Sequence, residues 1–295
     1  MQKQTISLVL GSGGARGLAH IGVIERLVAS GYEIRSIAGS SMGALIGGIY
    51  ATGKLDVYAG WVSALERRDV LGLLDLSFGR NGLFKGERII DTLRTLIGDQ
   101  DIEDLPIKFT AVATDMESEQ EVRLNDGPLF DAIRASIAIP SIFTPHAYRG
   151  RQYLDGSLVN PIPISATLDD DTDLTVAVNL SARPDGPVKV DVPGRIAENG
   201  HRSEYRQGIA KFVDDLRQRL DRATESTPGM MDVIAKSINI VTNSLAQAQI
   251  ANFEPDIVIN IPRNICTFYE FHRAREMIEI GRRHTDEALK HFHDG

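Results

Sequence analysis

The chain has 295 residues, 42% of them hydrophobic, and its formal net charge of -8 corresponds to an isoelectric point near 5.4. This length and composition predict a globular protein with a sizeable core and exclude a disordered chain. The acidic balance argues against a general nucleic-acid binder and against overall attraction to anionic membranes, because both need clustered Lys and Arg.

Hydropathy and cysteine content narrow the class of protein further. No apolar run approaches the roughly 20 residues of a membrane-spanning helix. The run Ile6–Leu10 is too short for the core of a signal peptide, so we expect a cytoplasmic protein. The single cysteine, Cys266, excludes an internal disulfide and a metal site built from several cysteines, and we interpret it as a small buried hydrophobic residue.

The first predicted elements are a strand, a glycine-rich loop and a helix. The apolar run Ile6–Leu10 is followed by Gly11-Ser12-Gly13-Gly14-Ala15-Arg16-Gly17 and then by apolar residues at helical spacing. Such a loop binds a dinucleotide pyrophosphate or holds the oxyanion of an acyl-transfer intermediate. The dinucleotide pattern needs glycine at its sixth position, where this chain has Arg16, so we favour the oxyanion hole. Its candidate residues are Gly11, Gly13, Gly14 and Arg16; Arg16 either adds positive charge or simply faces solvent.

The next strand leads into the motif Gly39-Ser40-Ser41-Met42-Gly43. An apolar run precedes this motif, and the small-residue helix Ala44–Tyr50 follows it. This is the context in which Gly-x-Ser-x-Gly forms a nucleophile elbow, with Ser41 as the nucleophile. Gly39 and Gly43 would let the strand and the helix approach closely, and the N-terminal dipole of the helix would favour negative charge at the site. An ordinary glycine-serine turn is the alternative, so the assignment needs a second motif.

The rest of the chain alternates between predicted strands and helices, which favours a mainly parallel sheet with helices on both faces. A helical pattern over Val57–Leu76 leads into Ser77–Gly86, which has three glycines and apolar residues. We interpret this segment either as a mobile loop that gates an acyl site or as a plain connection. The further expected elements are strands over Ile34–Ala38, Ile107–Ala113, Val122–Leu124, Leu174–Leu180 and Asp256–Ile261, and helices over Glu87–Ile97, Leu129–Ala138 and Glu270–His293.

We expect a single α/β domain over residues 1–295, with a mainly helical excursion at about residues 183–253. Residues 182–206 are rich in proline, glycine and charge, and Ile209–Leu220 has one apolar helical face. A heptad-like stripe follows, made of Met231, Ile234, Ile238, Val241, Leu245 and Ala248. We expect this stripe to be buried on the parent domain or in the seam of a homodimer, and a lipid-facing surface is the remaining alternative.

A serine nucleophile needs a base, for which the chain offers histidines or an aspartate. The seven histidines fall on predicted helices or in irregular segments, none in a distinctive turn: His20, His146, His201, His272, His284, His291 and His293. Asp155 differs, because Asp155-Gly156 directly follows an apolar strand end and so fixes a carboxylate in a sharp turn. Burial would raise its pKa from about 3.9 toward a value that suits a base.

Together, the glycine loop at residues 11–17, the elbow at residues 39–43 and the turn Asp155-Gly156 resemble the patatin-like phospholipase family in their order and separation. Ala135–Pro140 and Asn160–Pro163 also resemble that family, so the likeness covers roughly residues 5–182. The chain is most similar to the bacterial single-domain branch. One departure is Ser157, where the family usually has alanine or glycine, and we expect the small hydroxyl to be tolerated.

The resemblance implies a three-layer α/β/α sandwich with a mainly parallel central sheet. It also implies a serine lipid acyl hydrolase in which Ser41 attacks the ester and Asp155 acts as the base, while the glycine loop holds the oxyanion. The implied substrates are phospholipids, lysophospholipids or other fatty acyl esters. The resemblance further implies hydrolysis without a metal. We also expect no cofactor and, from the acidic composition, no nucleic-acid partner, and we allow for a transient contact with a membrane surface.

Two other classes of function stay open. An α/β-hydrolase with a Ser-His-Asp triad would need a late histidine in a loop, whereas the late histidines here fall on a predicted helix. A non-catalytic regulatory protein on the same fold would have lost a dyad residue, and both Ser41 and Asp155 are present. We therefore favour the dyad esterase.

Overall fold

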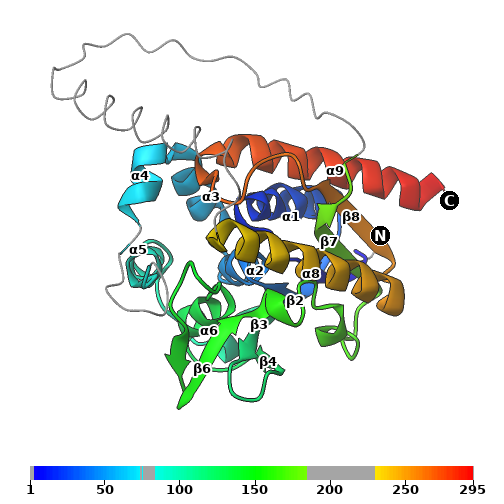
Figure 1. Ribbon diagram of the computed structural model, residues 1–295. Helices are drawn as coiled ribbons and strands as arrows, with labels where there is room; N and C mark the ends of the chain where they lie inside the picture. Colours follow the sequence, from blue (N-terminus) through cyan, green and yellow to red (C-terminus); the bar gives the residue numbers. More distant parts are fainter. Residues whose placement is uncertain (1–2, 74, 76–83, 185–229, 295) are drawn as a thin grey trace, which may run out of the picture. The chain divides into compact units, whose positions relative to one another are not determined.

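The computed structural model describes residues 3–73, 75, 84–184 and 230–294, and one mixed sheet organises them (Figure 1). Its strands are β1 Thr5–Leu10, β2 Glu33–Ser40, β3 Lys108–Asp115, β4 Glu121–Leu124, β5 His146–Tyr148, β6 Arg151–Asp155, β7 Leu174–Ala182 and β8 Ile257–Pro262. Their order is β5-β6-β3-β2-β1-β7-β8, and β4 pairs with β3 beside this path. The pairs from β3 to β8 along this order are parallel, whereas β4, β5 and β6 pair antiparallel.

The central strands are continuous apolar runs because both of their faces are covered. Ile6, Leu8, Val9 and Leu10 of β1 are fully buried, as expected for a parallel strand between two layers of helices. The strands predicted over residues 6–10, 34–38 and 107–113 are confirmed to within two residues at each end. The glycine loop and the elbow follow β1 and β2 directly, so both lie at the carboxyl edge of the sheet, where α/β proteins place their sites.

The helices connect and flank these strands. They are α1 Ala19–Ala29, α2 Met42–Ala51, α3 Leu55–Ala64, α4 Arg67–Gly72, α5 Glu87–Ile97, α6 Leu129–Ser136, α8 Met230–Phe253 and α9 Ala274–Asp294, with short 3-10 helices η1 Gly14–Leu18, η2 Ile102–Asp104, η3 Gly156–Leu158, η4 Ile164–Ala166 and η5 Phe271–Arg273. The helical pattern predicted over Val57–Leu76 corresponds to two helices, α3 and α4, with a break between them. The backbone of Leu65 is extended, and Asp69 accepts the N–H of Glu66 at 2.9 Å and so begins a second helix. Residues 77–83 of the predicted loop Ser77–Gly86 lie outside the described residues.

Helix α2 and the part of α8 from residue 241 onward cover opposite faces of the sheet. Leu10 of β1 faces α2, where a Cβ on Gly47 would lie 3.2 Å from its Cδ1. The neighbouring Val9 belongs instead to a buried cluster with Ala246, against which Ile250 of α8 also packs. Successive residues of a strand point to opposite faces, so the sheet has helices on both sides. Figure 1 also shows α1 and α9 side by side. The predicted three-layer α/β/α sandwich is confirmed.

The contacts of α8 bury only part of the predicted heptad-like stripe. Ile238 and Leu245 are half-buried, and the homodimer seam and the lipid-facing surface stay predictions. Val241 is 54% exposed and Ala248 is also exposed, whereas Ala246 is only 3% exposed and Thr242 is buried. The buried face of this part of α8 is therefore displaced around the helix from the predicted one, because the small Ala246 fits closely against the sheet. The side chains at positions 231 and 234 lie outside the described part of the chain.

We expect Ala246→Asp to lower the free energy of unfolding by about 3 kcal/mol, because it places a carboxylate without a partner in an apolar cluster. Ala248→Asp makes the same change of residue type on the exposed face of the same helix, so its effect should stay within about 0.5 kcal/mol. Urea denaturation of both variants measures the difference. Equal effects would show that the two faces of α8 are assigned wrongly.

The chain divides into two compact units. The first comprises residues 1–188 and 241–295, and the second comprises residues 189–240. The first unit contains the whole sheet and the C-terminal part of α8. Most of the second unit, including the helix predicted over residues 209–220, lies outside the described residues, so the excursion at about residues 183–253 stays a prediction. Among the described helices, none combines the length and the apolar character needed to cross a membrane.

Candidate active site

Ser41 lies in a sharp turn between β2 and α2. Its φ of 56° and ψ of -120° are unusual for a residue with a side chain, and such a conformation stores about 1–3 kcal/mol of strain. The turn needs glycine on both sides, because a Cβ on Gly43 would overlap the carbonyl of Leu10 and a Cβ on Gly39 would overlap the main chain of α2. Leu45 N–H donates to the Ser41 carbonyl at 3.1 Å and opens the helix. The strand, turn and helix context predicted for the elbow is present.

Asp155 lies at the end of β6, and its side chain meets that of Ser41. The Ser41 hydroxyl donates to Asp155 Oδ2 at 2.6 Å, and the other carboxylate oxygen accepts the N–H of Ser157 at 2.8 Å. The main chain of Asp155 is held as well: its N–H donates to Ala138 O at 2.9 Å, and its carbonyl accepts from Thr114 Oγ1 at 2.8 Å. The fold thus brings together the two side chains that the sequence suggests as nucleophile and base.

Burial sets the proton affinity of Asp155. The carboxylate is 1% exposed and Ser41 is 3% exposed. Desolvation raises the pKa of Asp155 to about 6, and hydrogen bonds from Ser157 and Ser41 oppose that rise by stabilising the charged form. At neutral pH the group is therefore a carboxylate that still has appreciable affinity for a proton, which is the property a general base needs.

Gly156 allows the end of β6 to approach β3 closely. A Cβ at this position would overlap the carbonyl oxygen of Val112 and would lie 2.9 Å from Ser40 Oγ. The glycine is thus required by packing. Ser157, where the chain departs from the family pattern, is half-buried, and its main-chain N–H and its hydroxyl both stabilise the Asp155 carboxylate.

Sequence reasoning missed Ser136, which contacts the candidate nucleophile. Its Oγ accepts the N–H of Ser41 at 2.9 Å and donates to the carbonyl of Val112 at 2.6 Å. Ser136 is the last residue of α6 and is fully buried. It belongs to the stretch Ala135–Pro140, which resembles the family, but no spacing rule connects it with a residue 95 positions earlier.

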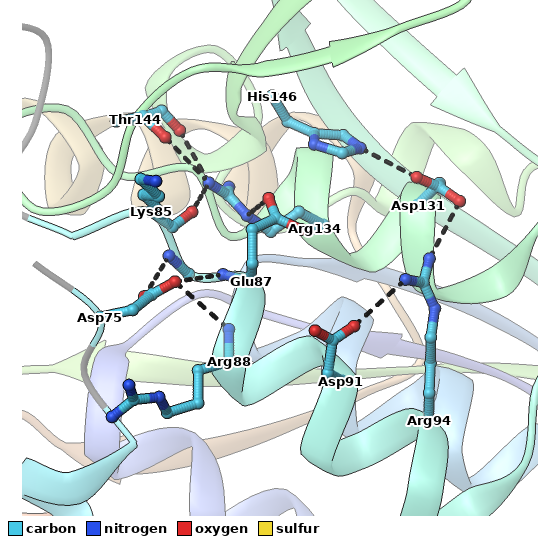
Figure 2. Close-up of polar contacts among 11 residues, drawn as sticks. Asp75, Lys85, Glu87, Arg88, Asp91, Arg94, Asp131, Arg134, Thr144 and His146 are labelled. Carbon is cyan, nitrogen blue, oxygen red and sulfur yellow. Dashed lines mark hydrogen bonds and ion pairs between the residues drawn. The ribbon is translucent and has the colours of Figure 1, made fainter. Parts of the chain in front are cut away.

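Helix α6 is anchored by two polar side chains, which Figure 2 shows. The buried Arg134 donates to the carbonyl of Lys85, just before α5, and to the carbonyl of Thr144 at 3.0 Å. One turn earlier on the helix, Asp131 pairs with His146 of β5 at 3.2 Å. These bonds tie α6 to neighbouring parts of the chain and thereby fix the serine at its C-terminal end.

The glycine loop lies beside the elbow. A Cβ on Gly17 would overlap Met42 Cβ, so the loop contacts the residue that follows the candidate nucleophile. In the described part of the chain, the N–H groups of Gly13 and Gly14 have no hydrogen-bond partner. Free N–H groups next to a strained serine and a helix N-terminus are the components of an oxyanion hole.

Gly11 and Arg16, which the sequence also suggests for the oxyanion hole, both make hydrogen bonds that support the loop. The N–H of Gly11 donates to the carbonyl of Val178 at 3.1 Å and so continues the sheet, while its carbonyl contacts His20 Nε2 at 2.8 Å. The Arg16 guanidinium donates to the carbonyl of Gly13 at 3.1 Å and to the carbonyl of Arg263 at 3.0 Å. The N–H of Gly11 is therefore already bonded within the sheet, which corrects its assignment to the oxyanion hole, whereas the positive charge expected of Arg16 beside the loop stays a prediction.

No described histidine hydrogen-bonds to Ser41 or Asp155. His20 is fully buried, and desolvation lowers its pKa to about 4, so the ring is neutral at pH 7. Its Nε2–H donates to the carbonyl of Gly11. His146 lies on a strand, contrary to the irregular segment expected, and faces Asp131. His201 lies outside the described residues.

Among the described residues, no group of three or more His, Cys, Asp or Glu could hold a metal ion. Burial raises the pKa of the Cys266 thiol to about 11, which keeps it protonated at neutral pH.

Comparisons with known proteins identify the family. A family model described as patatin-like phospholipase matches residues 8–168, more than half of the chain. An uncharacterized NTE family protein of Mycobacterium tuberculosis is 38% identical over 97% of this chain and 92% of its own length. Lysophospholipase NTE1 of Yarrowia lipolytica is 31% identical over 62% of this chain and 13% of its own length. Among solved structures, VipD from Legionella pneumophila aligns over 99% of this chain and 67% of its own, with 12% identity and a TM-score of 0.42. The family model and the mycobacterial relative show that this chain belongs to the patatin-like phospholipase family, a family of lipid hydrolases.

Proposed function

We propose that this protein is a serine lipid acyl hydrolase that uses Ser41 and Asp155 as a catalytic dyad. The observation that carries the proposal is the 2.6 Å hydrogen bond from the Ser41 hydroxyl to a buried carboxylate. Asp155 would take the role that histidine has in a triad. Membership of the family supports lipid acyl esters as substrates, and the name of the Yarrowia relative makes lysophospholipids the first class to assay.

In the acylation step, Ser41 Oγ attacks the carbonyl carbon of the ester while its proton passes to Asp155 Oδ2. Negative charge then develops on the carbonyl oxygen. The N–H groups of Gly13 and Gly14 and the N-terminus of α2 would stabilise that charge. When the tetrahedral intermediate collapses, the leaving alcohol takes the proton from Asp155 and the acyl group stays on Ser41.

Deacylation repeats these steps with water as the nucleophile. A water molecule gives a proton to Asp155 and attacks the acyl carbon, and the same N–H groups stabilise the second tetrahedral intermediate. Collapse returns the proton to Ser41 Oγ and releases the fatty acid. The cycle restores the Ser41–Asp155 hydrogen bond of the starting enzyme.

The pKa of Asp155 predicts an acid limb in the activity. Asp155 must be deprotonated to act as a base, and burial raises its pKa to about 6. We therefore expect kcat/KM to level off above pH about 7 and to fall about tenfold per pH unit below pH about 6. The measurement uses a short uncharged ester between pH 4 and 8, with circular dichroism at each pH to confirm folding. Unchanged kcat/KM down to pH 4 would contradict the role of Asp155.

A fluorophosphonate probe with peptide mapping tests the nucleophile directly. We expect the probe to label Ser41 in the wild-type chain and to label nothing in Ser41→Ala. The wild-type enzyme should hydrolyse lysophosphatidylcholine before labelling and should lose this activity once it is labelled. Ser40→Ala is the matched control, because Ser40 is the adjacent buried serine and its Oγ has no hydrogen-bond partner among the described residues. Labelling at another residue, or none at all, would refute the assignment of Ser41.

A further inference from the structure

We propose that Ser136 is a positioning residue for the reaction, and that its hydroxyl sets the place of the Ser41 main chain relative to Asp155. The inference rests on the proposed Ser41–Asp155 dyad. Ser136 does not touch the reacting atoms. It acts through two main-chain groups, the N–H of Ser41 at 2.9 Å and the carbonyl of Val112 at 2.6 Å.

The chemistry of the groups fixes the direction of both hydrogen bonds. A serine hydroxyl has one proton to donate and two lone pairs that accept. The carbonyl of Val112 can only accept, so the Ser136 proton points to it. The N–H of Ser41 can only donate, so it points to a lone pair of Ser136. Because Ser136 is fully buried, its hydroxyl is shielded from the bulk water that would otherwise compete for these bonds.

Ser41 needs such a restraint because its backbone is strained. At a φ of 56° the residue stays in place only where its surroundings hold it. The carbonyl of Ser41 is held by Leu45 N–H at 3.1 Å, and the N–H is held by Ser136. Without the Ser136 hydroxyl, a buried N–H loses its partner and the strained turn loses one of its two main-chain anchors.

Residues 136–138, at the end of α6 and just after it, also contact the proposed base, Asp155. Val112, which accepts the Ser136 proton, has its carbonyl oxygen against Gly156, the residue after Asp155. Two residues beyond Ser136, the carbonyl of Ala138 accepts the N–H of Asp155 at 2.9 Å. Residues 136–138 therefore contact both members of the dyad, and the hydroxyl is the link to the nucleophile. Removal of the Ser136 hydroxyl would therefore displace Ser41 but leave the hydrogen bond from Asp155 N–H to Ala138 O in place.

The test compares Ser136→Ala with Thr285→Val. Thr285 of α9 is also fully buried, and its hydroxyl also donates to a carbonyl, that of Gly281 at 2.8 Å. We expect Ser136→Ala to lower kcat about 10- to 100-fold, since displacement of a catalytic group by about 1 Å has effects of this size. KM should stay within about twofold of the wild-type value, and the rate of fluorophosphonate labelling at Ser41 should fall by the same factor as kcat. Thr285→Val should keep wild-type kcat and labelling.

A folded Ser136→Ala with wild-type kcat and labelling rate would overturn the inference, and so would a rise in KM alone. Ser136→Cys keeps the shape of the side chain with a somewhat larger atom, and its thiol is only a weak acceptor and donor. It therefore decides the question if the alanine variant does not fold. Reduced kcat in Ser136→Cys supports the role, and wild-type kcat overturns it. If the wild-type chain neither hydrolyses esters nor reacts at Ser41, the proposed function fails, and this inference fails with it.

Discussion

Ser41→Ala and Asp155→Asn should each lower kcat for ester hydrolysis by at least about a thousandfold without unfolding the protein. Alanine removes the attacking oxygen of the proposed mechanism, and asparagine cannot accept the proton that this mechanism transfers across the 2.6 Å hydrogen bond. Because nucleophile and base act as one unit, the double variant should lose little more than either single variant. Hydrolysis of lysophosphatidylcholine and of a short soluble ester measures the loss, and thermal unfolding confirms that each variant is folded.

The histidines provide the contrast to these variants. Replacement of His146, His201 or His272 should leave substantial activity; in the structure His146 pairs with Asp131 and His272 with Arg67. His20 differs from them, because its buried ring holds the carbonyl at the start of the glycine loop. A folded variant at 146, 201 or 272 that is as inactive as Ser41→Ala would show a Ser-His-Asp triad and refute the dyad.

Gly43→Ala should lower the free energy of unfolding by at least about 4 kcal/mol or prevent folding, which is exceptional for the addition of one methyl group. The added Cβ would overlap the carbonyl of Leu10, a main-chain atom of the central strand β1. Neither group can move without displacing the first turn of α2 or the pairing of β1 with its neighbours. Urea denaturation measures the stability, and activity should be lost with it because Ser41 belongs to the same turn.

Gly60→Ala is the matched control for this effect. Gly60 lies on α3, and a Cβ there would meet no atom within 4 Å. Since alanine favours a helix more than glycine does, this variant should be more stable by about 0.5–1 kcal/mol. The same substitution should therefore have opposite signs at the two positions. Destabilisation at both would mean that helix geometry, and not the approach of Leu10, decides the outcome.

The sequence alone predicts features that depend on neighbouring residues. The strands at residues 6–10, 34–38 and 107–113 are evident because a strand covered on both faces is a continuous apolar run. The elbow around Ser41 is also evident from adjacent residues, because its tight turn needs glycine at positions 39 and 43. The break at Leu65 is not evident, because the helical pattern of side chains continues through it while the backbone does not.

Tertiary structure decides what depends on residues far apart in the chain. Ser41 and Asp155 are 114 positions apart, and only the order of the strands brings the ends of β2 and β6 to the same edge. The roles of Ser136 and Gly11 are decided in the same way, because whether a hydroxyl or an N–H group is free depends on which carbonyl the fold places beside it. Local sequence thus determines which chemical groups the turns present, and the packing of the sheet determines which of them are already bonded and which are left for a substrate.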